Sequence, residues 1–362
     1  MAPATALAVV TATSVLPFNI SFQDGLCLRC EAQMLGAIQF SDRANLWAQG
    51  YTAPGGNAGA GEWALLTSNN GGRSWRELRN SWSHNDESRG FFHGIRDGWI
   101  EAPNSLRLGA EPYYASTTDG GRRWRPLHVP NSFVVQIFYS GVGRGAAFAN
   151  DQYSKKSTFF VTRDNGLHWR SSPIGRDMWI DQFAYSSPNT PVLAGCADNE
   201  TVILASPDAG THWSRSQIPQ MSHPETVGCE AAVDGLAFRT GKPGFALVQR
   251  HSFPLTKADA YASVWRTRDG GSNWTRVFFE RYPQGRWFDG PYTLGNLTIV
   301  FVKTGKKASV LYSRNDGESW SRVPLPTPLS GCFETKKSLT CTAGLKGFRI
   351  ANLTSTTVAH AR

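Results

Sequence analysis

The octapeptide SNNGGRSW (residues 68–75) opens a series of six related stretches, each beginning with Ser or Thr, carrying Gly at its fifth position and closing with Trp. The other copies are TTDGGRRW (117–124), TRDNGLHW (162–169), SPDAGTHW (206–213), TRDGGSNW (267–274) and SRNDGESW (313–320). Successive copies begin 49, 45, 44, 61 and 46 residues apart. A period of this length is typical of folds that repeat one small sheet around an axis.

Each position of the octapeptide suits a tight hairpin turn. The third residue is Asp or Asn in every copy, and its side-chain oxygen can accept hydrogen bonds from backbone N–H groups across the turn. The fifth residue is always Gly, which adopts positive φ without a steric penalty. The closing Trp offers roughly 150–250 Å² for burial. We therefore predict a structural role for these acids, with paired catalytic carboxylates such as Asp119 or Asp269 as the rival interpretation.

The octapeptide resembles the Asp-box, or BNR repeat, of sialidase-type β-propellers, and the resemblance covers about residues 36–325. It implies that each box joins the third and fourth strands of a blade, on the face opposite the ligand site. We predict one all-β propeller domain over residues 1–362, with seven blades of which six carry a box. The predicted blades are 36–80, 90–129, 133–174, 181–218, 233–280, 287–325, and a last blade from 326–355 plus an N-terminal strand at 5–18. Six blades are the alternative.

The formal net charge of +9 invites an acidic partner. An arginine, however, follows the box Trp within two positions in every copy: Arg76, Arg125, Arg170, Arg215, Arg276 and Arg322. These residues begin the outermost strand of each blade, whose free edge charged side chains protect from pairing with other chains. The sequence has no aromatic and basic strip of the kind that binds single strands, so we expect no nucleic-acid ligand.

Six cysteines favour disulfides and an oxidising compartment. Cys196 and Cys229 flank the fourth box, and we predict that they pair. Cys27 and Cys30 could form a redox pair, or half of a zinc site with Cys332 and Cys341, which ring closure would bring near. The second pair lacks the spacing typical of zinc sites, so we expect no metal and no cofactor.

The N-terminal stretch MAPATALAVVTATSVLPF has no Lys or Arg and too few apolar residues for a membrane span. We expect a β-strand there and no visible export signal. Together with the cysteines, this predicts a monomeric extracytoplasmic protein that is periplasmic, secreted or in a thylakoid lumen.

Function is expected where the repeat breaks down, in the loops of the face opposite the boxes. We predict no catalytic residues and a binding surface formed by Asp86, Arg89, Arg176, Asp177, His223, Glu225, Arg250, Tyr261, Arg281, Tyr282, Arg286 and Asp289. The favoured function is recognition of a protein partner or an acidic glycan. The regular boxes are similar to those of photosystem II assembly and stability factors and of bacterial BNR-repeat proteins.

The alternative is an exo-acting glycoside hydrolase of sialidase type. The resemblance would then assign Arg176, Arg250 and Arg286 to a substrate carboxylate, Tyr261 or Tyr282 with Glu225 to the nucleophile, and Asp86 to the acid. The F/Y-R-I-P element of sialidases is missing from the N-terminal region. Phe348, Arg349 and Ile350 are followed by Ala351 and lie in the last strands, which favours the binding function.

Overall fold

The computed structural model is built of β-strands, and no helix occurs among the residues it describes. These are residues 16, 18–24, 26–28, 34–40, 45–52, 62–71, 73–78, 90–93, 96–102, 113–130, 134–141, 143–150, 156–176, 178–187, 189–198, 200–218, 229, 231–239, 241–250, 260–282, 286–334, 338–343 and 349–355. They accordingly contain no helix that could cross a membrane.

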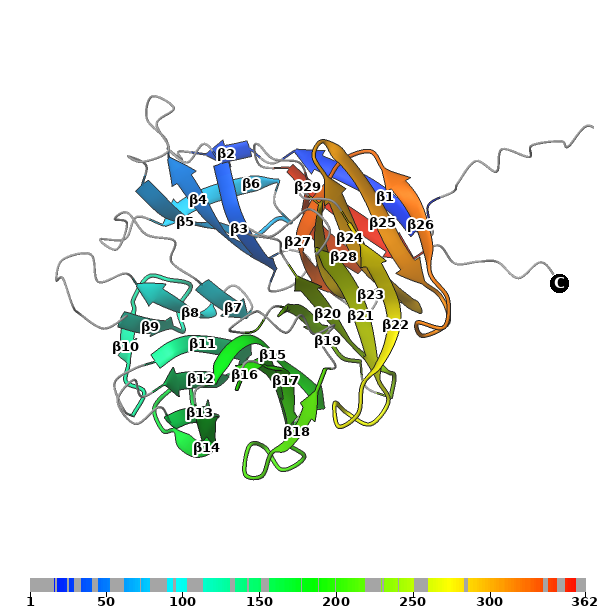
Figure 1. Ribbon diagram of the computed structural model, residues 1–362. Coiled ribbons are helices and arrows are strands. Elements are labelled where there is room, and N and C mark those ends of the chain that lie inside the picture. Colours follow the sequence, from blue (N-terminus) through cyan, green and yellow to red (C-terminus); the bar gives the residue numbers. More distant parts are fainter. Residues whose placement is uncertain are drawn as a thin grey trace, which may run out of the picture.

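The described strands form seven sheets that follow one another in chain order around a centre (Figure 1). The chain is therefore an all-β propeller, as the six boxes predict. The first box-bearing sheet contains β3 (Met34–Phe40), β4 (Leu46–Thr52), β5 (Glu62–Ser68) and β6 (Ser74–Leu78). The second contains β7 (Gly90–His93), β8 (Asp97–Ala102), β9 (Tyr113–Thr117) and β10 (Arg125–Leu127).

The other four box-bearing sheets, which we call blades 3 to 6, repeat this antiparallel order from the inside outward. Blade 3 has β11 (Val134–Gly141), β12 (Arg144–Asn150), β13 (Lys156–Thr162) and β14 (Arg170–Arg176). Blade 4 has β15 (Trp179–Ser187), β16 (Thr190–Ala197), β17 (Glu200–Ala205) and β18 (Ser214–Gln217). Blade 5 has β19 (Ala232–Ala237), β20 (Gly244–Arg250), β21 (Tyr261–Thr267) and β22 (Thr275–Arg281). Blade 6 has β23 (Arg286–Leu294), β24 (Leu297–Thr304), β25 (Lys307–Ser313) and β26 (Ser321–Leu325).

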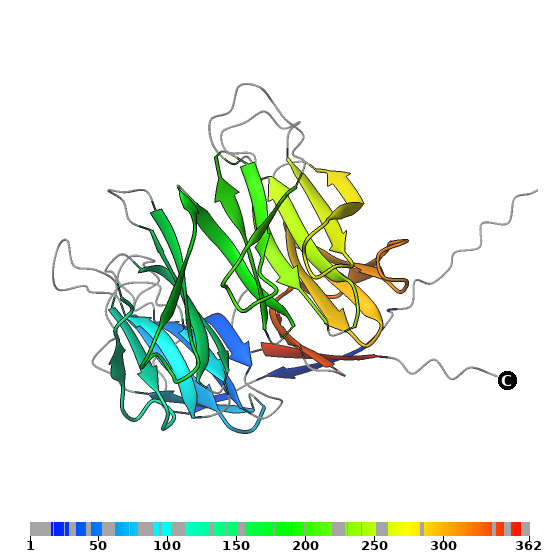
Figure 2. The same ribbon diagram turned by 90° about the horizontal axis from the view of Figure 1, so that it is seen from below.

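The terminal sheet joins both ends of the chain. It contains β27 (Leu329–Glu334), β28 (Ser338–Ala343) and β29 (Arg349–Ser355), and β1 (Phe18–Asp24) pairs antiparallel with β29 at its edge (Figure 2). The inner strands β27 and β3 are neighbours, which brings the last sheet against the first.

The described N-terminal strand of this sheet is Phe18–Asp24; of the strand predicted at 5–18, only Leu16 and Phe18 lie among the described residues. The segment FNISFQD alternates apolar and polar residues, which suits an edge strand with one buried face. Immediately after it, β2 (Leu26–Leu28) pairs in parallel with β6 of the first blade. Two neighbouring sheets thus take their outermost strand from one short N-terminal segment.

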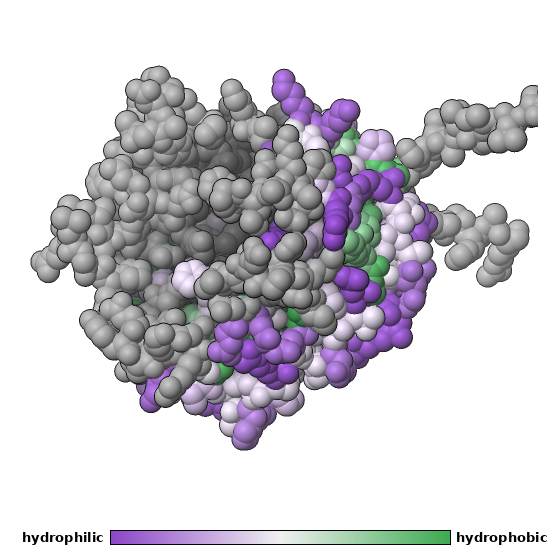
Figure 3. Space-filling model, in the orientation of Figure 1, coloured by the Kyte–Doolittle hydropathy of each residue, from purple (hydrophilic) through white to green (hydrophobic). Residues whose placement is uncertain are grey.

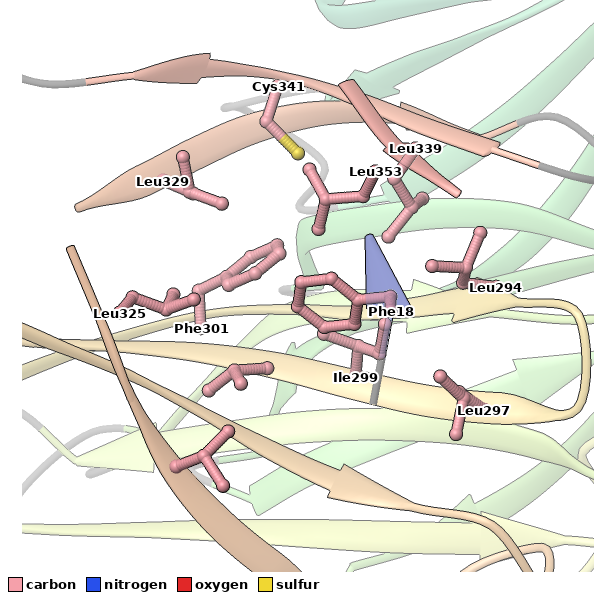
Figure 4. Packing of buried hydrophobic residues seen from close by; sticks show 12 residues of the cluster. Phe18, Leu294, Leu297, Ile299, Phe301, Leu325, Leu329, Leu339, Cys341 and Leu353 are labelled. Carbon is pink, nitrogen blue, oxygen red and sulfur yellow. The ribbon is translucent and has the colours of Figure 1, made fainter. Parts of the chain in front are cut away.

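The core lies between successive sheets. The cluster between blade 6 and the terminal sheet contains Phe18 of β1, Ile299 and Phe301 of β24, and Leu339 and Leu353 of the C-terminal strands (Figure 4). Similar clusters fill the other described interfaces, whereas hydrophilic side chains cover much of the described outer surface (Figure 3). Removing apolar area from water at each interface is worth roughly 25 cal/mol per Å², so the ring is held by repeated local contacts.

The box turn has the hydrogen bonds that its sequence predicts. In the third copy, Thr162 Oγ1 donates to Asp164 Oδ1 (2.8 Å) and accepts from the Gly166 N–H (3.0 Å). The same Asp164 oxygen accepts from the His168 N–H (2.9 Å). These bonds, mainly those from the backbone and side chain of His168, hold the pKa of Asp164 well below its usual range. The box acids are structural.

The third and seventh positions of the box form a second pair. In the third, fourth and fifth copies the other oxygen of the acid meets a ring nitrogen or an amide, as in Asp164 with His168 Nδ1 (2.6 Å). The second copy has Arg123 at the seventh position. Where it is Asn70 or Asn315, the amide donates instead to the hydroxyl of Ser74 or Ser319 (2.8 and 3.0 Å). When the third residue changes from an acid to an amide, the seventh residue therefore changes from a hydrogen-bond donor to an acceptor.

Two consecutive residues of each described box lie in the left-handed region. The predicted Gly is one of them, with φ of 78° to 108° in copies two to six; Gly72 lies outside the described residues. The other is the fourth residue, which in copy three is Asn165 (φ 62°) and in copy four is Ala209 (φ 59°). The backbone N–H of Ala209 donates to Asn189 O in the hairpin between β15 and β16 (2.8 Å), so box and hairpin lie on one face.

Arginines of one blade hold the box of the next. Arg125 Nη2 donates to Asn165 O (3.2 Å), Arg170 Nη2 to Ala209 O (2.6 Å), and Arg266 Nη1 to Asp316 O (3.0 Å). Arg125 and Arg170 belong to the set predicted to protect sheet edges. They stand at those edges, but their guanidinium groups bind the backbone of the neighbouring turn, because its left-handed residue leaves a carbonyl oxygen without a ladder partner.

The box tryptophans of blades 2 to 6 pack against clusters that include residues of the preceding blade, and the burial of the six tryptophans differs. Trp75 is 1% exposed, whereas Trp124, Trp169, Trp213, Trp274 and Trp320 are partly exposed. Trp75 lies in β6, the only box-bearing outer strand in the described sheets that is covered by another strand, β2. The six tryptophans therefore share one position in the repeat but differ in extent of burial.

Two disulfides are described. Cys196 bonds to Cys229, as predicted, and Cys332 bonds to Cys341 across β27 and β28. The second bond contradicts the zinc-site alternative, because disulfide sulfurs are not thiolate ligands. The Cys27 backbone pairs with Trp75, while its side chain and Cys30 lie outside the described part. These bonds indicate an oxidising, extracytoplasmic compartment.

Gly166→Ala should destabilise the fold more than Gly241→Ala. Both glycines have positive φ (81° and 70°), but a Cβ at Gly166 would collide with the buried Leu127 of the preceding blade, while nothing lies within 4 Å of one at Gly241. We expect a loss of about 1 kcal/mol from strain alone at Gly241 and about 1–3 kcal/mol more at Gly166. Urea unfolding measures the loss of stability in both variants. Equal losses would contradict the packing of Gly166 against Leu127 of the preceding blade.

Acid should weaken the box turns. The lowered pKa values of Asp164 and Asp208 mean that their contribution is complete above the unfolded value and is lost as pH falls toward the folded one. We expect the melting temperature to fall below about pH 5, and less steeply in the double variant Asp164→Asn with Asp208→Asn. Asp316→Asn is the control, since its side chain accepts no hydrogen bond among the described residues; an equal flattening there would refute the assignment.

Candidate binding face

The face opposite the boxes carries the outer ends of the first strands. Because each box bonds to the hairpin between the first and second strands, antiparallel pairing places the start of the first strand and the end of the second on the other side. Trp179 pairs with Cys196 at this end of blade 4, and Arg286 pairs with Thr304 at this end of blade 6.

Blade 5 brings predicted binding residues together on this face. Arg250 ends β20, Tyr261 begins β21 and Arg281 ends β22, and the three occupy one row across the sheet. Tyr282 follows directly, with its N–H donating to Ala260 O (3.0 Å). Residues that are 31 positions apart in the chain therefore meet at one edge of the sheet.

Several of these residues are buried rather than presented to a ligand. Arg250, Tyr261 and Tyr282 are buried, and the Tyr282 hydroxyl donates to Arg250 O (3.4 Å). Burial, then the nearby charge of Asp234, raises the pKa of Tyr282 to about 12. Such a phenol is a poor nucleophile at neutral pH, which disfavours the sialidase-type role of Tyr282. Arg281 is exposed.

Arg286 is held in an ion-pair network between blades 5 and 6. It pairs with Glu280, and its Nε donates to Thr304 Oγ1 (3.0 Å). Glu280 also binds Arg322, whose Nη1 donates to Oε1 at 3.1 Å. The guanidinium is thus already engaged by a carboxylate, and gripping a substrate carboxylate would require it to leave that partner.

Three aspartates occupy equivalent irregularities of consecutive inner strands. Asp181 and Asp234 lie at register shifts of β15 and β19, and Asp289 borders the shift of β23. The sequence shows the pattern as IDQF (180–183), VDGL (233–236) and FDGP (288–291). Only Asp289 is in the predicted set; alignment of the inner strands with one another would have found the other two.

Each aspartate has a fixed hydrogen-bond partner. Asp181 Oδ2 accepts from the Val233 N–H (3.4 Å), which links blade 4 to blade 5. Asp289 Oδ1 accepts from the Tyr292 hydroxyl (2.9 Å), and that hydroxyl accepts from the Cys332 N–H (3.2 Å). Burial, together with the charge of Asp289, raises the pKa of Tyr292 well above its usual value.

The fully buried Gln249 links blade 5 to the inner strand of blade 6, and it is not among the residues predicted from the sequence. Its Nε2 donates to Asp234 Oδ2 (2.6 Å) and to Phe288 O (2.9 Å), and its Oε1 accepts from the Phe288 N–H (3.1 Å). One side chain therefore orients the Asp234 carboxylate and binds the inner strand of the next blade. A single Gln inside the apolar run GFALVQR gives no such signal beforehand.

The carboxyl group of Asp181 has a raised pKa. Burial is the main cause that raises its pKa to about 6, and the negative charge of Asp234 adds to it. Near neutral pH this group can both donate and accept a proton, while Asp234 accepts from Gln249. The pair can hydrogen-bond ligand hydroxyl or amide groups, and it has the elements of an acid and base pair.

Two tryptophans project from the same face. Trp179 and Trp287 each lie two residues before an inner-strand aspartate and are 57% and 55% exposed. Large apolar side chains at this level of exposure are common in recognition surfaces, where Trp is enriched among the residues that contribute most energy.

The remaining predicted residues cannot be placed. Asp86, Arg89, Asp177, His223 and Glu225 lie outside the described residues, and Arg176 ends β14 with its side chain also outside them. Their place in a binding surface stays a prediction. Within the described part, no three or more His, Cys, Asp or Glu side chains are grouped to hold a metal ion.

Comparison with solved structures agrees with the β-propeller fold. No protein-family model matches the chain, and no curated protein is similar to it. Among solved structures, the chain is similar to YCF48 bound to a D1 peptide, with 16% identity, a TM-score of 0.55 and coverage of 95% of this chain and 98% of that one.

Two other propellers are similar at lower identity. The GH74 xyloglucanase from Xanthomonas campestris has 10% identity and a TM-score of 0.52, and the match covers 91% of this chain but 52% of the enzyme. The propeller domain of the Trilobed protease from Pyrococcus furiosus has 7% identity and a TM-score of 0.52, with 87% and 94% coverage. At these identities the similarity establishes the β-propeller fold. The function has to be inferred from the site.

Asp181→Asn should stabilise the protein at neutral pH. Because the folded pKa of about 6 exceeds the unfolded 3.8, the buried charge costs stability once pH rises through this interval. We expect the variant to gain up to about 3 kcal/mol at pH 7–8 and nothing near pH 4. Thermal unfolding across pH measures this, with Asp198→Asn as a surface control. A difference that does not vary with pH would show that Asp181 titrates normally.

Proposed function

We propose that this protein is a non-catalytic binding propeller that recognises an extended segment of a protein partner through the face opposite its boxes. The observation that carries the proposal is the presence of exposed Trp179 and Trp287 at one position of two inner strands, beside fixed carboxylates. Exposed indoles with adjacent hydrogen-bond acceptors suit apolar side chains and the backbone amides of an extended peptide.

The similarity to YCF48 supports the class of partner. That propeller has a D1 peptide bound, and its match spans nearly the whole of both chains. The proposal takes from it a peptide-binding mode and not the peptide's identity. An acidic glycan is the competing ligand, and the three aspartates on this face disfavour it by charge repulsion.

We further propose that the ring has seven blades, with β1 as the outer strand of the seventh. The support is the four-stranded terminal sheet and the neighbouring β27 and β3. The disulfides support a place in the periplasm, outside the cell or in a thylakoid lumen.

A glycoside hydrolase remains the second candidate because of one observation. Asp181, with its raised pKa, lies beside the acceptor Asp234, and carboxyl pairs of this kind catalyse glycoside hydrolysis. The similarity in fold to a GH74 xyloglucanase supports keeping this candidate. The roles that the resemblance to sialidases would give Tyr282 and Arg286 are less favoured, since both side chains are engaged in packing or pairing.

Replacing both Trp179 and Trp287 by Ala should abolish partner capture. Loss of two central aromatic contacts costs at least about 2 kcal/mol each, or roughly 30-fold in Kd per residue. A pull-down from the native source identifies the partner, and titration with peptides from it measures affinity. The matched control is Leu167→Ala, which removes an equally exposed apolar residue (60%) from the opposite face.

Retained binding in the double Trp variant, or loss in Leu167→Ala, would contradict the assigned face. A panel of fluorogenic glycosides tests the second candidate. Turnover that exceeds a heat-inactivated sample and disappears in Asp181→Asn would replace the binding proposal with catalysis.

A further inference from the structure

The two exposed tryptophans of the candidate binding face occupy equivalent places but have different neighbours. Trp179 of blade 4 pairs with Cys196, and Trp287 of blade 6 pairs with Lys303. Directly opposed residues of an antiparallel pair lie on the same side of the sheet. The Lys303 side chain is therefore next to the Trp287 indole, whereas the residue beside Trp179 is an uncharged cysteine in a disulfide.

The next row of strand residues shows a contrast in charge. It contains Glu200, which begins the third strand of blade 4, and Lys307, which begins that of blade 6. Glu200 and Asp198 of the preceding turn both pair with Arg215 (3.5 and 3.0 Å). The blade 6 turn carries Lys306 beside Lys307, and both lysines are exposed. Blade 6 thus presents cations where blade 4 presents an ion pair.

Three lysines of blade 6, Lys303, Lys306 and Lys307, form what we call the lysine cluster. None of them makes an ion pair with a carboxylate among the residues that the structure describes. Two carboxylates lie on the stretch of chain around the blade 6 tryptophan, but Glu280 is bound by two arginines and Asp289 accepts from a tyrosine hydroxyl. The charge of the lysine cluster is therefore available to a ligand.

The middle of the same face has the opposite charge. Asp181, Asp234 and Asp289 lie on the inner strands of blades 4, 5 and 6. The residue of blade 5 that corresponds to the two tryptophans is the small Ala232, two positions before its aspartate. A ligand carboxylate is repelled by the aspartates and attracted by the lysine cluster. The face therefore distinguishes the two ends of a segment that lies across it.

We propose that the extended partner segment carries a run of acidic side chains at the end that lies over blade 6, where the lysine cluster binds them, and apolar side chains from Trp287 to Trp179. This inference rests on the proposed function and adds the chemistry and the placement of the bound segment. Exposed pairs of lysine and carboxylate are individually weak, so the lysine cluster contributes specificity and orientation, and its effect decreases with ionic strength.

Selection of a displayed library of random peptides on the full chain tests this inference. We expect enrichment of sequences in which apolar or aromatic residues are followed or preceded by a run of Asp or Glu. In the variant Lys306→Glu with Lys307→Glu, the apolar preference should remain and the acidic preference should disappear. Enriched apolar sequences without an acidic run would overturn the inference and leave the proposed function standing. Enrichment that is unchanged by replacing Trp179 and Trp287 with Ala would contradict both.

The affinity of one enriched peptide, acetylated and amidated so that its ends are uncharged, gives a second measure. Replacing its acidic residues by amides, or Lys307→Glu in the protein, should each weaken binding about tenfold at low ionic strength and less at high salt. Lys242→Glu is the matched control, since it makes the same charge change in an exposed turn of the box face. Unchanged melting temperatures confirm intact folds.

Equal affinity for the acidic and the amide peptide, or equal losses in Lys307→Glu and Lys242→Glu, would overturn the inference. Oligogalacturonate serves as the acidic glycan in the same titration. Tighter binding of this glycan than of the enriched peptide would also overturn it, because a uniformly negative ligand would then be preferred despite the aspartates.

Discussion

Contacts between neighbouring blades depend on a backbone carbonyl that the third, fourth and sixth box turns direct at the blade before them. Two left-handed residues in succession take this oxygen out of the strand ladder, and the Ser or Thr hydroxyl with the Asp or Asn oxygen fixes that conformation. The preceding blade supplies an arginine to the carbonyl and a packed side chain beneath the glycine, as Arg170 does for Ala209 and Leu127 does for Gly166. One short sequence thus specifies both a turn within a sheet and a contact between sheets.

The sequence predicted the repeated box turns and one disulfide, and it missed a strand pairing that has no repeated signal. The box turns, the positive φ of their glycines and the Cys196 to Cys229 bond follow from residue type and spacing. The parallel pairing of β2 with β6 does not, since three residues carry no periodicity and pairing of this kind is decided by tertiary contacts. The alternation in FNISFQD was visible, but the longer apolar run before it gave the stronger apparent strand signal.

The candidate site, too, was only partly predictable from the sequence. Antiparallel register brings Arg250, Tyr261 and Arg281 into one row at the end of blade 5. Their burial does not follow from residue type, so two residues suited to contact a ligand are instead packed inside. Asp181 and Asp234 were overlooked because each resembles an ordinary strand residue until the inner strands are superposed and a shared irregularity appears.

The N-terminal segment that completes two neighbouring sheets also constrains the order of assembly. During synthesis β1 leaves the ribosome more than 300 positions ahead of its partner β29. Blades 3 to 6 can form from adjacent hairpins as they emerge, whereas β1 must wait for β29 with an unsatisfied strand edge. In the nascent chain β1 therefore stays open to mispairing until β29 emerges, and shielding of β1 until then would favour correct ring closure.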